Sequence, residues 1–141
     1  MNHVNQENVL SDKTVLIVDD VHVDASLAKT RLQIIWIHPD NIHIAENGQD
    51  AINMARQQVF DLIMMDIQLP DIDGLTVTKE IRSHYKENSP KIIGYTAYKK
   101  EDVPWIETMD GIIFKPCDTV AFKNEIIKNL QQERSESLDI T

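Results

Sequence analysis

The sequence predicts an α/β fold in which one doubly wound sheet of five parallel strands carries helices on both faces. Short runs of apolar, mostly β-branched residues occur five times along the chain, each followed by a segment suited to a helix. The runs end at polar residues, as buried strands do where they leave the core. No repeat or low-complexity segment interrupts the alternation, and alternating strands and helices form a parallel sheet with right-handed crossovers.

The predicted strands differ in how many of their faces are apolar. The run at 14–18 is continuous up to Asp19, and the run at 60–65 is interrupted only by Asp61, so both strands are expected to be buried on both faces. The run at 41–45 alternates between polar and apolar residues, which is typical of a strand with one exposed face. The five strands are expected at residues 14–18, 41–45, 60–65, 91–95 and 111–114.

The helices are predicted from apolar residues at helical spacing and from residues that favour helix ends. Asp24 is expected to cap the first helix, Pro39 to follow its end and Asn47-Gly48 to open the second. Between residues 97 and 110 the pattern weakens, and a short helix is expected there because Pro104 fits only a first turn. The longer helices are expected at residues 25–35, 49–57, 75–85 and, after a cap by Asp118 or Thr119, up to Leu130.

Length and composition indicate a single acidic domain. A chain of 141 residues is long enough to bury one core without disulfides or structural metals. The polar segment 1–13 is expected to be flexible, residues 14–130 to form the domain, and residues 131–141 to be a disordered tail. Met1 and this tail favour a stand-alone protein.

Charge and hydropathy exclude several classes of function. With a net charge of -9 and no cluster of Lys or Arg, the chain lacks the basic surface that nucleic-acid binding requires. Its apolar runs are far shorter than the roughly 20 residues of a membrane helix, so no membrane insertion is expected. Cys117 is the single cysteine, and the first residues do not resemble a signal peptide. A cytoplasmic location is therefore expected.

Polar residues follow four of the predicted strands at the edge of the sheet where ligands bind in doubly wound folds. A carboxylate can attack phosphorus, while an ammonium and a hydroxyl can hold phosphoryl oxygens. We therefore expect Asp66 to be a phosphoacceptor, with Thr96 and Lys115 holding the phosphoryl group. The strand-end residues are Asp19, Asp20, Asp66, Thr96 and Lys115.

Three carboxylates at one edge would repel one another unless a cation lay among them. Oxygen ligands with open water positions suit Mg²⁺. Asp20 and Asp66 are expected to bind this ion directly, and Asp19 through a water molecule. The backbone carbonyl of Gln68 completes the expected set of protein ligands.

The same strand ends carry short motifs that occur in a fixed order along the chain. Each motif is weak alone, but the ordered set is specific. The motifs are Asp19-Asp20, the segment 64–70, Asp73-Gly74, Thr96-Ala97 and Phe114-Lys115-Pro116.

On these motifs the chain resembles the receiver domains of two-component response regulators, in particular single domains similar to the chemotaxis regulator. The resemblance covers about residues 14–130 and implies a flavodoxin-like sheet of order 2-1-3-4-5. It also implies that Asp66 accepts a phosphoryl group from a histidine kinase or a histidine phosphotransfer protein, with Mg²⁺ as cofactor. A cis peptide bond before Pro116 is a further implication.

The function expected from this resemblance is a phosphorylation-dependent signalling module whose output is contact with a downstream protein. Two alternatives stay open: a phosphorelay intermediate or phosphate sink, and a receiver-like interaction module that is not phosphorylated. Catalysis is expected to be limited to its own phosphoryl acceptance and hydrolysis. A haloacid-dehalogenase-like phosphatase would need a second acid where Gln68 stands, and a flavodoxin-like electron carrier would need a phosphate-binding loop in place of the acidic one.

Two features concern how such a module would signal. Ile112 stands where the family commonly has an aromatic residue that moves with the threonine, so that coupling does not carry over. Trp105 lies in the weak helical segment and is a candidate anchor for a partner protein.

Overall fold

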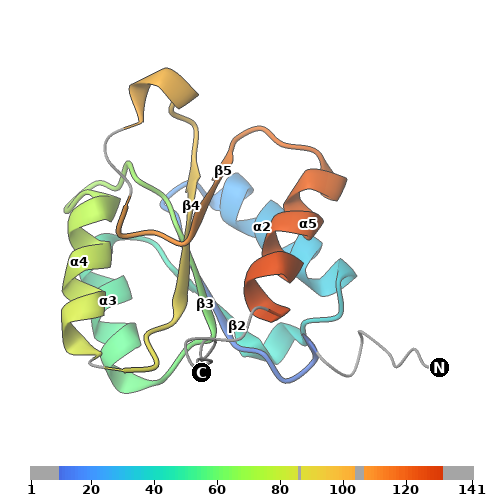
Figure 1. Cartoon of the computed structure of the whole chain (residues 1–141), viewed down its shortest axis with the longest axis horizontal. Helices are drawn as coiled ribbons and strands as arrows, with labels where there is room; N and C mark the ends of the chain where they lie inside the picture. Colours follow the sequence, from blue (N-terminus) through green and yellow to red (C-terminus); the bar gives the residue numbers. More distant parts are fainter. Residues whose placement is uncertain (1–9, 86, 104–106, 132–141) are drawn as a thin grey trace, which may run out of the picture.

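The computed structural model describes residues 10–85, 87–103 and 107–131 and has the predicted architecture (Figure 1). Five parallel strands form one sheet in the order β2-β1-β3-β4-β5, which confirms the predicted order. The helices α2 and α5 cover one face, and α3 and α4 cover the other (Figure 1). The strands are β1 Val15–Val18, β2 Ile42–Ala45, β3 Leu62–Met65, β4 Lys91–Thr96 and β5 Gly111–Phe114. The helices are α2 His22–Ile34, α3 Gly48–Gln57, α4 Gly74–His84 and α5 Thr119–Gln131, with 3-10 turns η1 Pro39–Asn41 and η2 Lys100–Asp102.

The register of the sheet brings the ends of the strands to a common edge. Val18, at the end of β1, is paired with Met65, at the end of β3. At the other side of the sheet, Thr96 of β4 is paired with Phe114 of β5. The residues that follow these positions are therefore neighbours in space although they are far apart in the sequence.

Alternate residues of the central strands pack into two separate apolar layers. Ile17 and Met64 lie in the layer under α2 and α5, whereas Val18 and Met65 lie in the layer under α3 and α4. All four side chains are buried, as predicted for strands covered on both faces. Leu10 is also fully buried in the first layer, so the packed fold begins inside the segment that was expected to be flexible.

The first helix begins earlier than predicted, and Asp24 does not cap it. α2 starts at His22, its N-cap Val21 makes no side-chain cap, and Asp24 lies in the first turn. Asp19 forms the local turn instead, because its Oδ1 accepts the Val21 N–H at 2.9 Å. The prediction for Asp24 was wrong because its carboxylate is engaged by a residue distant in sequence.

Side-chain caps at the other helices agree with the sequence. Asn47 Oδ1 accepts the Asp50 N–H at 2.8 Å at the start of α3. Asp118 Oδ1 accepts the Ala121 N–H at 2.7 Å in the first turn of α5, which selects Asp118 over Thr119 as the cap. Helix starts that rest on local side-chain hydrogen bonds could thus be read from the sequence.

The segment between β4 and β5 differs from the short helix that was expected. Among its described residues, only the 3-10 turn Lys100–Asp102 is helical. Pro104 and Trp105 lie outside the described residues, and with them the expected partner anchor. Met109, which is 9% exposed, belongs to the apolar layer under α3 and α4, and the partly buried Tyr98, Val103 and Ile112 pack against this layer. Ile112 thus has a packing role at the position where an aromatic residue is common.

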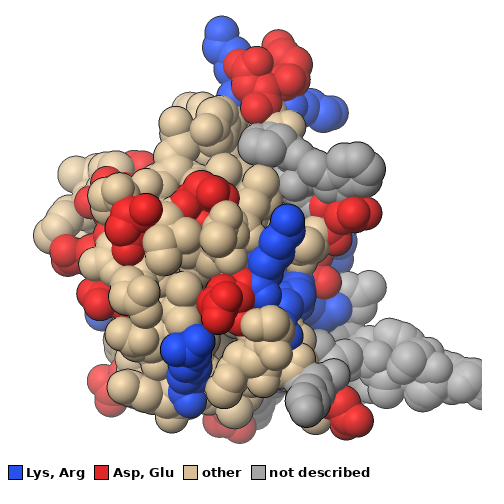
Figure 2. Space-filling model, turned by 90° about the vertical axis from the view of Figure 1, so that its left-hand side faces the viewer, with Lys and Arg blue, Asp and Glu red and all other residues tan. Residues whose placement is uncertain are grey.

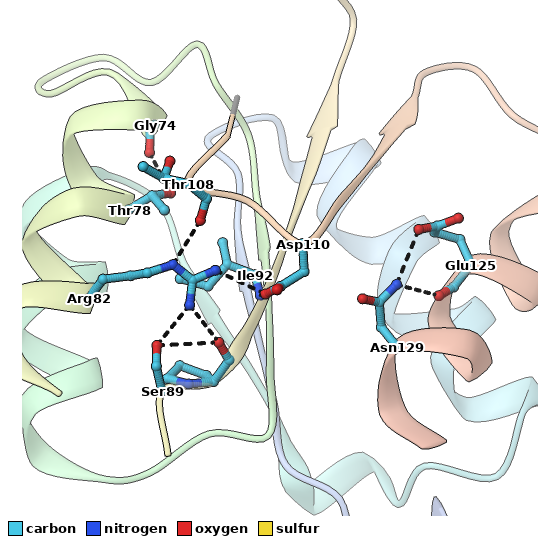
Figure 3. A network of polar contacts seen from close by, with 10 residues as sticks. Gly74, Thr78, Arg82, Ser89, Ile92, Thr108, Asp110, Glu125 and Asn129 are labelled. Carbon is cyan, nitrogen blue, oxygen red and sulfur yellow. Dashed lines mark hydrogen bonds and ion pairs between the residues drawn. The ribbon is translucent and has the colours of Figure 1, made fainter. Parts of the chain in front are cut away.

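Arg82 of α4 fastens the end of this segment to the bottom of the sheet (Figure 3). Its guanidinium donates to the Thr108 carbonyl at 2.7 Å, to Ser89 Oγ at 2.8 Å and to the Pro90 carbonyl at 3.1 Å. It also pairs with Asp110 Oδ2 at 2.9 Å. One side chain therefore joins α4, the start of β4 and the residues before β5.

Replacing Arg82 with alanine is expected to lower the free energy of unfolding by about 2 to 3 kcal/mol, because half-buried acceptors lose their donors. Arg82→Lys should restore only part of this, since an ammonium cannot reproduce the planar fork. Urea denaturation measures both effects. The control is Arg56→Ala, which breaks the exposed 3.1 Å pair between Arg56 and Glu80 and should cost less than about 1 kcal/mol. Equal losses in the two alanine variants would contradict the role of Arg82.

The face formed by α3 and α4 carries acidic and basic side chains interspersed with neutral ones (Figure 2). The Arg56–Glu80 pair joins the two helices across this face. Across the described residues, the structure contains no helix that is both long enough and apolar enough to cross a membrane.

Candidate functional site

Three carboxylates from two strands meet at the edge of the sheet. Asp19 and Asp20 follow β1, and Asp66 follows β3. One oxygen from each lies within 4.8 Å of the others. The backbone holds these positions, because Asp19 N–H donates to the Ala45 carbonyl at 3.0 Å and Asp66 N–H to the Val18 carbonyl at 2.9 Å. Three hard oxygen donors this close together fit a small divalent cation.

The three carboxylates differ in exposure. Asp19 is 1% exposed and Asp66 is 5% exposed, whereas Asp20 lies at the surface. The acidic cluster, called the pocket below, therefore has two buried members, Asp19 and Asp66, and one exposed member, Asp20.

Burial raises the pKa of Asp66 to about 6. The Lys115 ammonium and the Gln68 N–H, which donates to Asp66 Oδ1 at 3.0 Å, oppose this rise in pKa, while Asp19 and Asp20 add to it. The result is a carboxylate whose negative charge is poorly compensated by the protein alone. A cation or a bound phosphoryl group with its metal would relieve that imbalance.

This pKa predicts how pH acts on stability in the absence of metal ions. Because the pKa of Asp66 is higher in the folded state than its usual 3.8, protonation of Asp66 stabilises the folded state. This contribution to the free energy of unfolding is fully present below pH 3.8 and is lost as pH rises through about 6. In EDTA, wild type should therefore lose about 2 kcal/mol of unfolding free energy between about pH 4 and pH 7 that Asp66→Asn does not lose. Urea denaturation at both pH values tests this expectation, and a difference independent of pH would contradict it.

Lys115 is the cation of the site and follows β5. Its Nζ donates to Asp19 Oδ2 and to Asp24 Oδ2, each at 2.8 Å, and lies 3.6 Å from Asp66 Oδ2. Burial lowers the pKa of Lys115, but the hydrogen bonds to Asp19 and Asp24 outweigh this effect and raise the pKa above its usual value. Lys115 is consequently charged at every physiological pH.

Thr96 is fully buried at the end of β4. Its Oγ1 accepts the Tyr98 N–H at 3.1 Å, and its carbonyl accepts the Lys115 N–H at 2.7 Å. The hydroxyl thus keeps its own proton for another acceptor. The peptide bond between Lys115 and Pro116 is cis, as the family resemblance implied.

The loop after Asp66 is fixed by two contacts that were not predicted. Asp71 accepts the N–H groups of Gly48 and Gln49 at 2.8 and 2.9 Å, which ties the loop to the start of α3. Gly74 N–H donates to the Ile67 carbonyl at 2.8 Å. The backbone that follows Asp66 is thereby held at Ile67 and at Asp71.

Sequence reasoning missed two residues at the site. Asp24 binds Lys115, and the Lys115 Nζ lies 4.9 Å from the centre of the Tyr95 ring. Asp24 was assigned to a local cap, although it lies only four residues after Asp20 in the sequence. Tyr95 precedes Thr96 and carried no signal of its own.

A family profile described as "Response regulator receiver domain" matches residues 15–127. The chain belongs to this family. It is a signalling module of the two-component type, with homologues in the receiver regions of histidine kinases.

Curated relatives are much longer than this chain. The aerobic respiration control sensor protein ArcB of Escherichia coli is 28% identical over 130 residues, which are 90% of this chain and 16% of ArcB. The chain therefore matches a small part of each such relative.

Solved receiver structures have the same fold. The response regulator TrrA of Thermotoga maritima, in complex with Mg²⁺ and beryllofluoride, is 34% identical with a TM-score of 0.72, covering 84% of this chain and 99% of that one. A receiver domain of Ssk1 from Saccharomyces cerevisiae, crystallised with the histidine phosphotransfer protein Ypd1, has a TM-score of 0.69 at 24% identity. The match covers 82% of this chain and 87% of that one.

Proposed function

We propose that Asp66 accepts a phosphoryl group from a phosphohistidine of a histidine kinase or phosphotransfer protein. The observation that carries this proposal is the position of the acceptor. Its carboxylate is 5% exposed and has two further carboxylates within 4.8 Å and the Lys115 ammonium 3.6 Å away. No second acid stands at Gln68, which agrees with a protein that catalyses only its own phosphoryl acceptance and hydrolysis.

In the transfer step, a carboxylate oxygen of Asp66 attacks phosphorus. A P–O bond forms, the P–N bond to the donor imidazole breaks, and the imidazole leaves with the bonding electron pair. Lys115 stabilises the negative charge on the phosphoryl oxygens. The Thr96 hydroxyl donates a hydrogen bond to one of them.

The acidic residues fit Mg²⁺ as the cofactor of this reaction. Asp20, Asp66 and the Gln68 carbonyl would hold it directly, and Asp19 through a water molecule. When bound, Mg²⁺ supplies the positive charge that the three carboxylates lack. The raised pKa of Asp66 supports this assignment, because it shows that the protein alone does not fully compensate the negative charge of this carboxylate.

Output is proposed to be a change of the surface between β4 and β5. Thr96 Oγ1 already accepts from Tyr98 N–H, so a shift of Thr96 toward the phosphoryl group would move the backbone of the segment that follows. A downstream protein would distinguish the two arrangements. The proposed location is the cytoplasm, where the chain would meet the histidine kinase or phosphotransfer protein and the downstream protein.

A second candidate is a phosphorelay intermediate, which returns the phosphoryl group to another histidine. It is favoured by the relatives, because the chain matches 16% of the sensor protein ArcB and 7% of the hybrid signal transduction histidine kinase L of Dictyostelium discoideum, and shares its fold with a receiver crystallised with a phosphotransfer protein. Transfer from phosphorylated protein to a phosphotransfer protein would distinguish the relay from a final receiver.

The first test is the intact mass of the wild-type protein after incubation with acetyl phosphate in Mg²⁺ or in EDTA. We expect one phosphoryl group to be added in Mg²⁺ and almost none in EDTA. Folded protein that gains no phosphoryl group from acetyl phosphate or from a phosphohistidine donor would support the non-phosphorylated interaction module instead.

A further inference from the structure

Lys115 is bound by a carboxylate that has no part in the proposed transfer. Its ammonium has three N–H donors, and two of them are taken by Asp19 and Asp24 at 2.8 Å. Asp66 Oδ2, at 3.6 Å, lies beyond hydrogen-bonding distance. In this arrangement Lys115 is closer to Asp24 than to the phosphoacceptor.

The two carboxylates that bind Lys115 differ in how easily they can release it. The Asp19 side chain is 0% exposed. If Lys115 left it, Asp19 would remain as a buried charge with the Val21 N–H as its donor. The Asp24 side chain is 34% exposed, so water can replace the ammonium there. If Lys115 moves toward a phosphoryl group, Asp24 is the partner that it leaves.

A purely local role does not account for the position of Asp24. The residue lies in the first turn of α2, where a negative charge interacts favourably with the helix dipole. It makes no cap, however, and its Oδ2 accepts from a side chain 91 positions away in the sequence. The dipole term would affect helix stability alone, whereas a contact with Lys115 also bears on the phosphoryl group.

We propose that Asp24 is a positioning residue that draws Lys115 away from Asp66 and so weakens the hold of the pocket on a phosphoryl group. This inference rests on the proposed function of Asp66 and Lys115. When the phosphoryl group arrives, Lys115 keeps Asp19, releases Asp24 and pairs with a phosphoryl oxygen. Asp24 thereby sets the resting position of the lysine and lowers the stability of the phosphorylated form.

Beryllofluoride, added with Mg²⁺ as a phosphoryl mimic, provides the test by isothermal titration calorimetry. We expect Asp24→Asn to bind it about fivefold more tightly than wild type, the size expected for a partly exposed ion pair. Asp24→Ala should change the affinity in the same direction. Urea denaturation checks that each variant is folded, and a helix-dipole effect alone would alter stability without tightening binding.

Glu46→Gln is the matched control, because it also removes one negative charge beside the pocket. Glu46 pairs with His22 at 3.4 Å, and its side chain is 59% exposed. Its affinity should stay within about twofold of wild type. An equal gain in Glu46→Gln would show an effect of net charge and would overturn the role of Asp24.

A crystal structure of the wild type with Mg²⁺ and beryllofluoride tests the movement itself. Lys115 Nζ is expected to contact a fluorine and Asp19 and to have left Asp24. A lysine that still binds Asp24, or an affinity of Asp24→Asn equal to or weaker than wild type, would overturn this inference alone. Absence of beryllofluoride binding to folded wild type would instead overturn the proposed function, and the role of Asp24 with it.

Discussion

Replacement of Asp66 with asparagine is expected to abolish phosphoryl acceptance while leaving the protein folded. Asp66 is the proposed phosphoacceptor, and the amide of asparagine is too weak a nucleophile to take the place of its carboxylate. Acetyl phosphate and Mg²⁺ should therefore add one phosphoryl group to the wild type and none to Asp66→Asn, as measured by intact mass. The loss should be complete rather than partial.

Stability and acceptance should change in opposite directions in this variant. Asp66 is 5% exposed and its pKa is raised to about 6, so the ionised carboxylate destabilises the metal-free fold at neutral pH. Asp66→Asn should consequently be at least as stable as wild type in EDTA at about pH 7. Asp61→Asn serves as the matched control at the other end of the sheet, where Asp61 Oδ2 accepts the Thr14 N–H at 2.8 Å. That variant should keep full acceptance, and phosphorylation of Asp66→Asn at the wild-type level would refute the site.

The elements that could be predicted are those that depend on local pattern. The strands follow from continuous apolar runs, and Asn47 and Asp118 cap helices through donors three residues away. Parallel topology then places the carboxyl ends of the strands at one edge of the sheet, which is why the three carboxylates and Lys115 could be grouped from the sequence alone. A site composed of strand ends is unusually accessible to sequence reasoning.

What could not be predicted depends on pairing over long distances or on competition between two uses of a residue. Asp24 can cap a helix or bind a cation, and only the fold shows that Lys115 is within reach. Leu10 is a single apolar residue in a polar segment, too little for any periodic signal, yet it is fully buried. Met109 and Ile112 pack into the apolar layer under α3 and α4, beside a segment where a short helix was expected and where the described residues form only the 3-10 turn Lys100–Asp102. Each case needs knowledge of which surfaces face one another.

Gly74 of the Asp73-Gly74 motif packs directly against the backbone of the phosphoacceptor Asp66, and its replacement is expected to have the second large effect. Gly74 begins α4 directly against the loop after β3, with its N–H bound to the Ile67 carbonyl at 2.8 Å. A Cβ added at Gly74 would clash with the backbone carbonyl oxygen of Asp66 and would lie 2.8 Å from Ile67 Cα. Both obstacles are backbone atoms, so a rotamer change cannot relieve them.

Gly74→Ala is therefore expected to lower the free energy of unfolding by about 3 kcal/mol and to slow phosphoryl acceptance in the molecules that stay folded. Urea denaturation and intact mass with acetyl phosphate measure the two effects. Gly94→Ala is the control: a Cβ there would meet only side-chain atoms, Met109 Sδ at 3.0 Å and Ile112 Cγ1 at 3.3 Å, and should cost about 1 kcal/mol or less because methionine is flexible. Wild-type stability and acceptance in Gly74→Ala would mean that the loop can move away from α4 without disturbing Asp66. Loss of both would show that α4 and the acceptor are built as one unit, so that the position of the phosphoryl group is set by the packing of a helix as well as by the strand that carries Asp66.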